Sequence, residues 1–170
     1  MKSSEELFKG TDWRITLDTA PLPDGREKKA EIAHRADSAN ILAFVRENIV
    51  LLLREYRAIH GEYFWMLPGG RINKEIDKTE GARREFREET GYDARDFKYF
   101  FTTILSESVD LNSHIFVAQD LFPSSLEKDH DEIIEVHEVE LEEALKLVLS
   151  QPKIHAPSAI ALQRWIMENK

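Results

Sequence analysis

The chain has 170 residues, of which 42% are hydrophobic and 32% are charged, and its formal net charge is −9. This length and composition fit one globular domain with a sizeable core, alone or with a small extension. The acidic charge disfavours sequence-independent binding to nucleic acid or to an anionic membrane, and the absence of cysteine excludes disulfides and thiolate zinc sites. No apolar run approaches the roughly 20 residues that a membrane-spanning helix requires, so we expect a cytoplasmic protein.

The amino-terminal region predicts an antiparallel β-hairpin. Residues 12–19 alternate apolar and polar side chains, residues 21–25 (PLPDG) have strong turn chemistry, and residues 26–35 then form a returning strand. We therefore expect residues 1–36 to form a β-hairpin extension and residues 37–170 to form the main domain. A hairpin with one apolar face is only marginally stable alone, which favours docking onto a partner.

Strands also dominate the rest of the chain. Further strands are predicted at residues 39–45, 49–57, 63–67, 97–105, 113–121 and 133–139, and helices at 141–149 and 157–168. A chain that is mostly β with a few packed helices predicts an α+β fold, in which helices cover a sheet as in an α/β/α sandwich.

One helix has clear start and stop signals. Asp77 is a plausible N-cap with Glu80 three residues later, as in a capping box, and Gly91 is a typical residue just beyond a helix C-terminus. A glycine pair, Gly69 and Gly70, precedes this helix. The layout of strand, glycine-rich loop and helix brings the loop backbone close to the helix face.

Three carboxylates lie on one face of this helix. Because each residue advances about 100°, Glu85, Glu88 and Glu89 fall within an arc of roughly 100°, and they repel one another unless a cation lies between them. Carboxylate oxygens suit Mg²⁺, which is often held together with substrate phosphates, and the Gly70 carbonyl could complete its shell. The pattern favours metal-dependent chemistry on a phosphorylated substrate, and a solvated Glu/Arg helix face is the alternative.

The same segment resembles the Nudix box, G-x5-E-x7-R-E-U-x-E-E-x-G-U, where U is a bulky apolar residue. The matching positions are Gly70, Arg84, Glu85, Phe86, Glu88, Glu89, Gly91 and Tyr92. One position departs, because Ile76 stands where the family has its first glutamate, with Glu75 displaced by one residue. In the family that glutamate mainly pairs with the arginine, so we expect a structural effect more than lost chemistry.

The resemblance covers nearly the whole chain and implies both a fold and an activity. The segments W-R-I-T-L-D, L-P-D-G-R-E and L-L-R-E-Y-R look like the branch of ADP-ribose pyrophosphatases. It implies a Nudix α/β/α sandwich with a mixed sheet, and a homodimer formed through the N-terminal extension. The implied reaction is Mg²⁺-dependent hydrolysis of nucleoside diphosphate sugars to a nucleoside monophosphate and a sugar phosphate, with Mn²⁺ as another usable metal.

The resemblance also assigns the metal site and the general base. It implies that Glu85, Glu88, Glu89 and the Gly70 carbonyl bind the metal. A carboxylate on the loop before the last strand accepts a proton from water in similar enzymes, and we favour Glu132 for this role. Three other residues of that loop are alternatives: Glu127, Asp129 and Asp131.

Three further residues are candidates for substrate binding. Arg57 matches a position that contacts the diphosphate in this branch, and Arg35 could reach a terminal sugar or phosphate, across the dimer if the extension is exchanged. Trp13 could stack on a nucleobase, because an aromatic face accepts any base, although a tryptophan on an alternating strand equally suits a dimer core.

The substrate within this class stays open. Enzymes specific for ADP-ribose tend to carry a proline about sixteen residues past the box, whereas residues 105–109 read LSESV. This favours a broader nucleoside diphosphate sugar hydrolase, with ADP-ribose as the most favoured single substrate. The alternatives are hydrolysis of dinucleoside polyphosphates or nucleoside triphosphates, and a non-catalytic nucleotide-binding homologue, which Ile76 motivates.

Overall fold

A computed structural model describes residues 3–72, 77–127 and 132–169. Within these ranges the strands are β1 (Ser3–Lys9), β2 (Arg14–Pro21), β3 (Glu27–His34), β4 (Asp37–Arg46), β5 (Ile49–Arg57), β6 (Glu62–Met66), β7 (Arg71–Ile72), β8 (Tyr92–Ser106), β9 (Val109–Pro123) and β10 (Ile134–Glu140). The helices are α1 (Lys78–Thr90), α2 (Leu141–Leu149) and α3 (Ala156–Glu168). No helix in the described part of the chain is long and apolar enough to cross a membrane.

A mixed sheet forms the centre of the molecule. Strand β4 runs parallel to β9 on one side and antiparallel to β5 on the other. Strand β9 also pairs with β8, and β5 pairs with β6 and β10, in each case antiparallel. The predicted strands at 97–105 and 113–121 extend in both directions, because β8 and β9 form one long antiparallel ladder. The expected mixed sheet is therefore confirmed.

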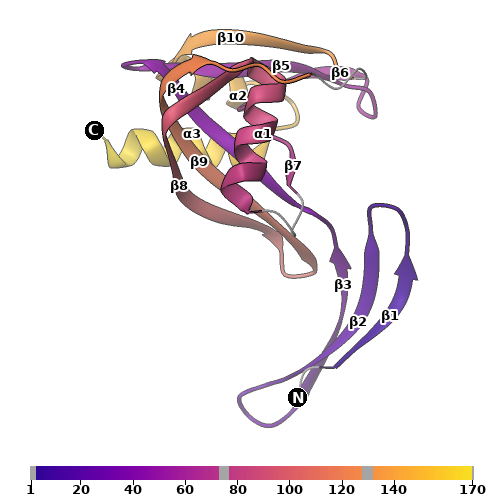
Figure 1. Ribbon diagram of the computed structural model, residues 1–170. Coiled ribbons are helices and arrows are strands. Elements are labelled where there is room, and N and C mark those ends of the chain that lie inside the picture. Colours follow the sequence, from indigo (N-terminus) through magenta and orange to yellow (C-terminus); the bar gives the residue numbers. More distant parts are fainter. Residues whose placement is uncertain (1–2, 73–76, 128–131, 170) are drawn as a thin grey trace.

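Helices cover both faces of this sheet, as Figure 1 shows. Successive residues of β4 point to opposite faces, so Ile41 packs with Ala82 and Phe86 of α1, whereas Leu42 packs in the core that contains α2 and α3. Phe86 and Leu42 are fully buried. This layered packing confirms the predicted sandwich. It also fixes α1 against β4, the strand whose backbone is hydrogen-bonded to the glycine loop.

The N-terminal strands extend away from the body of the molecule (Figure 1). Strands β2 and β3 form the expected antiparallel hairpin, and β1 adds a third strand that we did not predict, with Ser3 opposite Thr19. The segment SSEELFK lacks the alternation of a half-buried strand, and every residue of β1 is exposed. Only a short parallel pairing, Ala33 with Val109 and His34 with Asp110, joins β3 to β9.

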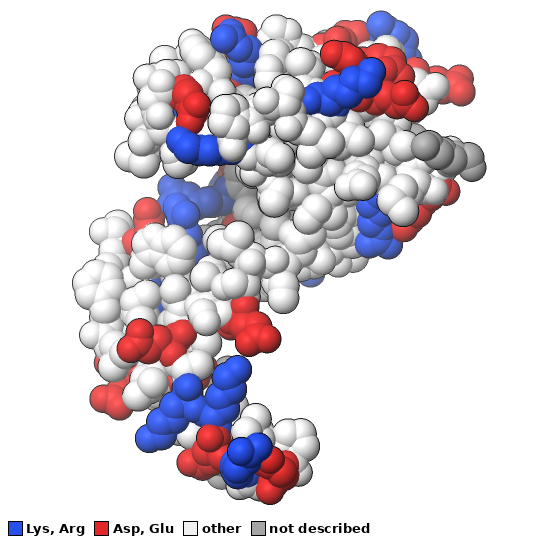
Figure 2. Space-filling model, turned by 180° about the vertical axis from the view of Figure 1, so that it is seen from behind, with Lys and Arg blue, Asp and Glu red and all other residues white. Residues whose placement is uncertain are grey.

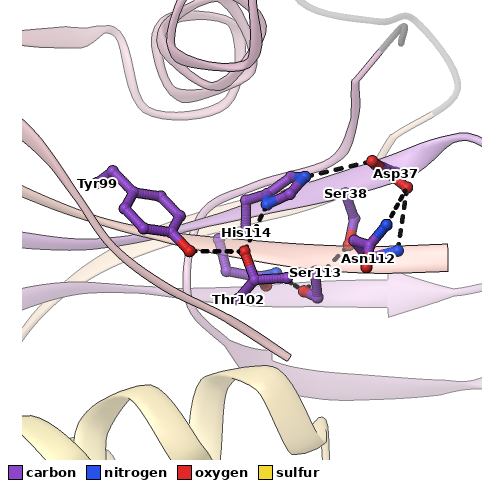
Figure 3. Close-up of polar contacts among 8 residues, drawn as sticks. Asp37, Ser38, Tyr99, Thr102, Asn112, Ser113 and His114 are labelled. Carbon is purple, nitrogen blue, oxygen red and sulfur yellow. Dashed lines mark hydrogen bonds and ion pairs between the residues drawn. The ribbon is translucent and has the colours of Figure 1, made fainter. Parts of the chain in front are cut away.

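A polar network connects β4, β8 and β9 beside the point where the extension meets the body (Figure 3). The Asp37 carboxylate accepts the backbone N–H of Asn112 at 3.0 Å and lies 3.2 Å from His114 Nε2. The other ring nitrogen of His114 lies 2.7 Å from Thr102 Oγ1, which is 2.8 Å from the Tyr99 hydroxyl. Because His114 is only 7% exposed, these partners satisfy a ring that water cannot reach.

Candidate active site

A cleft of about 1030 Å³ opens beside α1 and the glycine loop. Its walls include the two residues after β3, parts of β4, β5 and β6, the glycine loop, α1 and the segment before α3. Figure 2 shows basic side chains, in blue, where the N-terminal strands meet the body, and acidic side chains concentrated at the opposite end of the body. Five of the predicted site residues and the loop glycine line the cleft: Arg35, Arg57, Glu85, Glu89, Glu132 and Gly70.

The glycine loop is held between β4 and α1. The loop carbonyls of Pro68 and Gly70 accept the backbone N–H groups of Ile41 and Ala39, at 2.8 and 2.9 Å. The Gly69 N–H donates to Glu89 Oε2 at 2.6 Å. The predicted metal ligand Gly70 therefore already makes one hydrogen bond through its carbonyl oxygen, and its second lone pair is available to a cation.

Two carboxyl groups of α1 line the cleft wall, of which Glu89 is buried and Glu85 is half-buried. Glu89 is 6% exposed, and burial raises its pKa well above the ordinary value; the Gly69 N–H opposes this shift, while Glu55, Glu132 and Glu85 add to it. Burial likewise raises the pKa of Glu85, with Arg84 opposing and the Glu132 charge adding to the shift. Burial and mutual repulsion disfavour the ionised form of each carboxyl group on this wall, and a bound cation would favour it.

Glu88 is the third carboxylate of α1, and its charge also raises the pKa of Glu85. Its carboxylate is 3.7 Å from Arg84 Nε, and it does not line the cleft, whereas Arg84 Nη2 also donates to Glu85 Oε1 at 2.8 Å. Among the described residues, no three acidic or histidine side chains are already gathered closely enough to bind one ion. A metal held by all three predicted glutamates would therefore require their side chains to turn toward it.

The donor set nevertheless fits a hard divalent cation. Oxygen ligands are available from Glu85, Glu89 and the Gly70 carbonyl, and there is no sulfur ligand in the chain. Burial is the main cause of the raised pKa of Glu85 and Glu89, and neighbouring carboxylates add to it, so a cation bound here would favour their ionised forms. A bound cation would remove the repulsion among these carboxylates.

Glu55 belongs to the site, although sequence reasoning missed it. It is 4% exposed, and burial raises its pKa, with the Arg57 cation opposing and Glu132 adding to the shift. Arg57 Nη2 lies 2.8 Å from Glu55 Oε2, yet that oxygen has no partner of good hydrogen-bond geometry among the described residues. The available signal was the i, i+2 spacing of Leu53, Glu55 and Arg57, which puts all three on one face of β5.

The predicted substrate-binding residues lie at two places. Arg57 lines the cleft from the end of β5, where Nη2 donates to Met66 Sδ at 3.4 Å. Arg35 lines it from the segment after β3, with its guanidinium 5.0 Å above the Trp13 ring. The Nε atom of Arg35 is buried and has no hydrogen-bond partner among the described residues. Trp13 itself supports Arg35 and does not line the cleft.

Among the candidate general bases, Glu132 lines the cleft, and its charge acts on Glu55, Glu85 and Glu89 alike. Glu127 is exposed and does not line the cleft. Two further candidates, Asp129 and Asp131, and the box positions Glu75 and Ile76 lie outside the described residues.

Comparison with protein families matches the NUDIX domain to residues 34–161, which is most of the chain and includes every element of the cleft from Arg35 onward. The chain belongs to the Nudix family. Members of this family typically act with a divalent metal ion, in agreement with the donor set of the cleft.

Two curated Nudix relatives match almost the full length of the chain. The ADP-ribose pyrophosphatase of Bacillus subtilis is 31% identical over 164 residues, covering 95% of this chain and 89% of the relative. The methanol dehydrogenase activator of Bacillus methanolicus is 27% identical over 163 residues, covering 94% and 88%. Both alignments extend over the N-terminal strands as well as the Nudix domain.

A solved structure described as an ADP compounds hydrolase has the same fold. It superposes with a TM-score of 0.77 at 24% identity and covers 98% of this chain and 92% of that structure. At this coverage the likeness includes the N-terminal extension, so the extension is part of a fold that recurs in a distant relative.

Proposed function

We propose that the protein hydrolyses the diphosphate bond of nucleoside diphosphate sugars, releasing a nucleoside monophosphate and a sugar phosphate. The observation that carries this proposal is the placement of two crowded carboxyls, the half-buried Glu85 and the buried Glu89, in one cleft with two arginines, Arg57 and Arg35. Carboxylates that need a cation and arginines that suit phosphate oxygens together fit a metal-bound diphosphate.

ADP-ribose is the single substrate that we favour. The support is the similarity to the Bacillus subtilis ADP-ribose pyrophosphatase over 95% of the chain. The absence of proline from residues 105–109 favours acceptance of other nucleoside diphosphate sugars as well.

The residues of α1, the glycine loop and the segment at Glu132 have separate roles in the proposed reaction. Glu85, Glu89, the Gly70 carbonyl and Glu88, once it has turned, would hold Mg²⁺ or Mn²⁺. When bound, the cation neutralises charge that develops on the diphosphate and lowers the pKa of a water molecule. Glu132 accepts the proton of the attacking water.

Two arginines orient the substrate. Arg57 presents its remaining N–H donors to the diphosphate, while its ion pair with Glu55 fixes the direction of the guanidinium. The buried Nε–H of Arg35, which lacks a partner among the described residues, is available to an oxygen of the substrate.

The test is phosphate release from a panel of nucleoside diphosphate sugars, diadenosine polyphosphates and nucleoside triphosphates, each assayed with Mg²⁺ and with EDTA. Glu89→Gln keeps an acceptor for the Gly69 N–H but removes the charge, so we expect kcat to fall on the order of 100-fold or more. Glu80→Gln is the matched control, because Glu80 is exposed in the first turn of the same helix and lies outside the cleft. Equal turnover by Glu89→Gln and wild type would refute the assignment, and metal-dependent turnover of triphosphates alone would replace the substrate class.

We also propose that the chain forms a homodimer through its N-terminal extension. Strand β1 is exposed along its whole length, including Leu7 at 49% and Phe8 at 56%. Apolar side chains on a strand that contacts the body so little are typical of a surface that another chain covers. Light scattering should give twice the 19.7 kDa mass of the chain, and Phe8→Glu should shift it toward the monomer. A monomer mass for the wild type at micromolar concentration would contradict the proposal.

A further inference from the structure

A histidine to which we gave no role in the sequence closes one end of the cleft. His155 precedes α3 and lines the cleft together with Phe64 and Ile154. Its Nδ1 atom lies 2.7 Å from the hydroxyl oxygen of Ser158, which is fully buried. The side chain makes no capping hydrogen bond to the backbone of α3, so its orientation depends on the contact with Ser158.

The hydrogen bonds around Ser158 hold one ring nitrogen of His155. Ser158 Oγ accepts the backbone N–H of Leu67 at 2.8 Å, and His155 Nδ1 lies 2.7 Å from the same oxygen. We assign the Ser158 hydroxyl as the donor to Nδ1, so that the proton of the neutral ring lies on Nε2. The buried serine fixes the direction of the imidazole.

The ring stays neutral at physiological pH. Burial, with a smaller effect of the Arg57 cation, lowers the pKa of His155 to about 4. Nε2 has no hydrogen-bond partner among the described residues, and it is not among the buried polar atoms that lack one, so it is accessible from the cleft. The structure therefore presents an uncharged N–H donor at this end, where His60 also lines the cleft with its ring centroid 5.3 Å from that of Phe64.

The charges nearby favour an uncharged ligand group over a second anion. Lys153 also lines this end, but its ammonium lies 2.6 Å from Glu62 Oε1. Arg57, another cation of the cleft, is directed by Glu55, whose Oε2 lies 2.8 Å from Arg57 Nη2. Phosphate is normally bound by ionised donors, whereas a hydroxyl is well served by a neutral N–H beside apolar walls such as Phe64.

We propose that His155 is a specificity-determining residue, which donates its Nε2–H to a hydroxyl oxygen of the sugar of the substrate. This inference rests on the proposed function and deepens it, because it assigns the sugar to the end of the cleft at α3. The base end of the substrate would then contact other residues of the cleft wall, among which Arg35 is a candidate.

The test compares ligands that differ at the sugar. Binding of ribose 5-phosphate and of AMP is measured by calorimetry with Mg²⁺, for the wild type, His155→Phe and His155→Gln. His155→Phe removes the donor, so we expect about tenfold weaker binding of ribose 5-phosphate with AMP unchanged. His155→Gln supplies a neutral N–H from an amide and should recover part of the loss. His137→Gln on β10 is the control, because that histidine lies outside the cleft.

Kinetics provide a second, independent measurement. The ratio of kcat/KM for ADP-ribose to kcat/KM for an ADP ester whose sugar lacks hydroxyl groups should fall about tenfold in His155→Phe. A structural role alone would lower both values together and leave the ratio unchanged, and that result would overturn the proposal, as would unchanged ribose 5-phosphate binding. If no nucleotide sugar is hydrolysed, the proposed function fails, and the calorimetric comparison still decides the role of His155.

Discussion

Replacement of Gly70 by alanine is expected to impair catalysis while the protein stays folded. A Cβ on Gly70 would overlap the Glu85 carboxylate and would lie 3.0 Å from its Cδ, whereas non-bonded carbons prefer about 3.5–4.0 Å. The backbone of Gly70 is not in the left-handed region, and the clashing atoms are at the end of a flexible side chain. The carboxylate must therefore move, by about 1 Å, and misplacement of that size costs on the order of 100-fold in rate.

Gly69→Ala is the matched comparison, because the adjacent residue has the opposite surroundings. Gly69 has a φ of 146°, and a Cβ there would lie 2.8 Å from the Ala39 carbonyl carbon and 2.9 Å from Asn40 Cα, both in the backbone of β4. Backbone strain costs about 1–3 kcal/mol, and an overpacked contact adds a similar amount. At roughly 2–4 °C per kcal/mol for a chain of this size, the melting temperature should fall by about 5–20 °C.

The assays are thermal melting in EDTA and kcat/KM for ADP-ribose across a Mg²⁺ titration. Gly70→Ala should melt close to the wild type but require more Mg²⁺ and turn over about 100-fold more slowly. The double variant Gly70→Ala with Glu85→Asp shortens the displaced side chain, so its loss should be smaller than the product of the two single losses. Wild-type turnover by Gly70→Ala, or destabilisation as large as that of Gly69→Ala, would refute this account of the loop.

Three further predictions concern stability. The pKa of Glu89 is raised in the folded state, so the unfolded chain ionises first and metal-free protein loses stability as pH rises above the ordinary value of 4.5. In EDTA at neutral pH, Glu89→Gln should therefore be more stable than wild type. In urea titrations this difference should vanish below pH 4.5. The Asp77 carboxylate caps α1 at the N–H groups of residues 79 and 80, so Asp77→Ala should cost about 1 kcal/mol in urea unfolding, and no change would contradict the cap. Asp37→Asn keeps an acceptor for the Asn112 N–H but directs its amide N–H groups toward the Nε2 of buried His114. The loss of this contact should lower the free energy of unfolding by about 1–3 kcal/mol. An unaltered urea midpoint would show that the contact between Asp37 and His114 does not stabilise the fold.

The sequence alone determined the parts of this protein that local rules govern. Helix α1 starts after Asp77 and ends at Gly91, whose φ of 78° is the left-handed conformation that glycine favours, and both ends were readable because caps are made within a few residues. The alternation of residues 12–19, the turn after them and the returning strand likewise predicted the pairing of β2 with β3. The box residues on α1 identified the family because their spacing follows the helical repeat.

Only the tertiary structure decided how distant segments complete the cleft. Glu55 had no predicted role, and only the fold shows that it is buried in the site, where the charge of Glu132 acts on it. Burial lowers the pKa of His155 to about 4, and its ring is held by Ser158, in the first turn of α3, which also accepts the backbone N–H of Leu67. Such burial and hydrogen bonding depend on residues that are far apart in the chain.

Strand β1 is an element that the tertiary structure shows and the sequence did not predict. Its segment has no buried residue and therefore no periodic pattern from which a strand could be predicted. It is ordered by backbone pairing with β2 and by the Ser4 hydroxyl, which donates to Asp18 Oδ1 at 2.6 Å. Side-chain periodicity records burial, and backbone pairing leaves no such record. The sequence by itself therefore specified the elements that bury a face, whereas the tertiary structure specified where pairing and long-range contacts place the remaining residues.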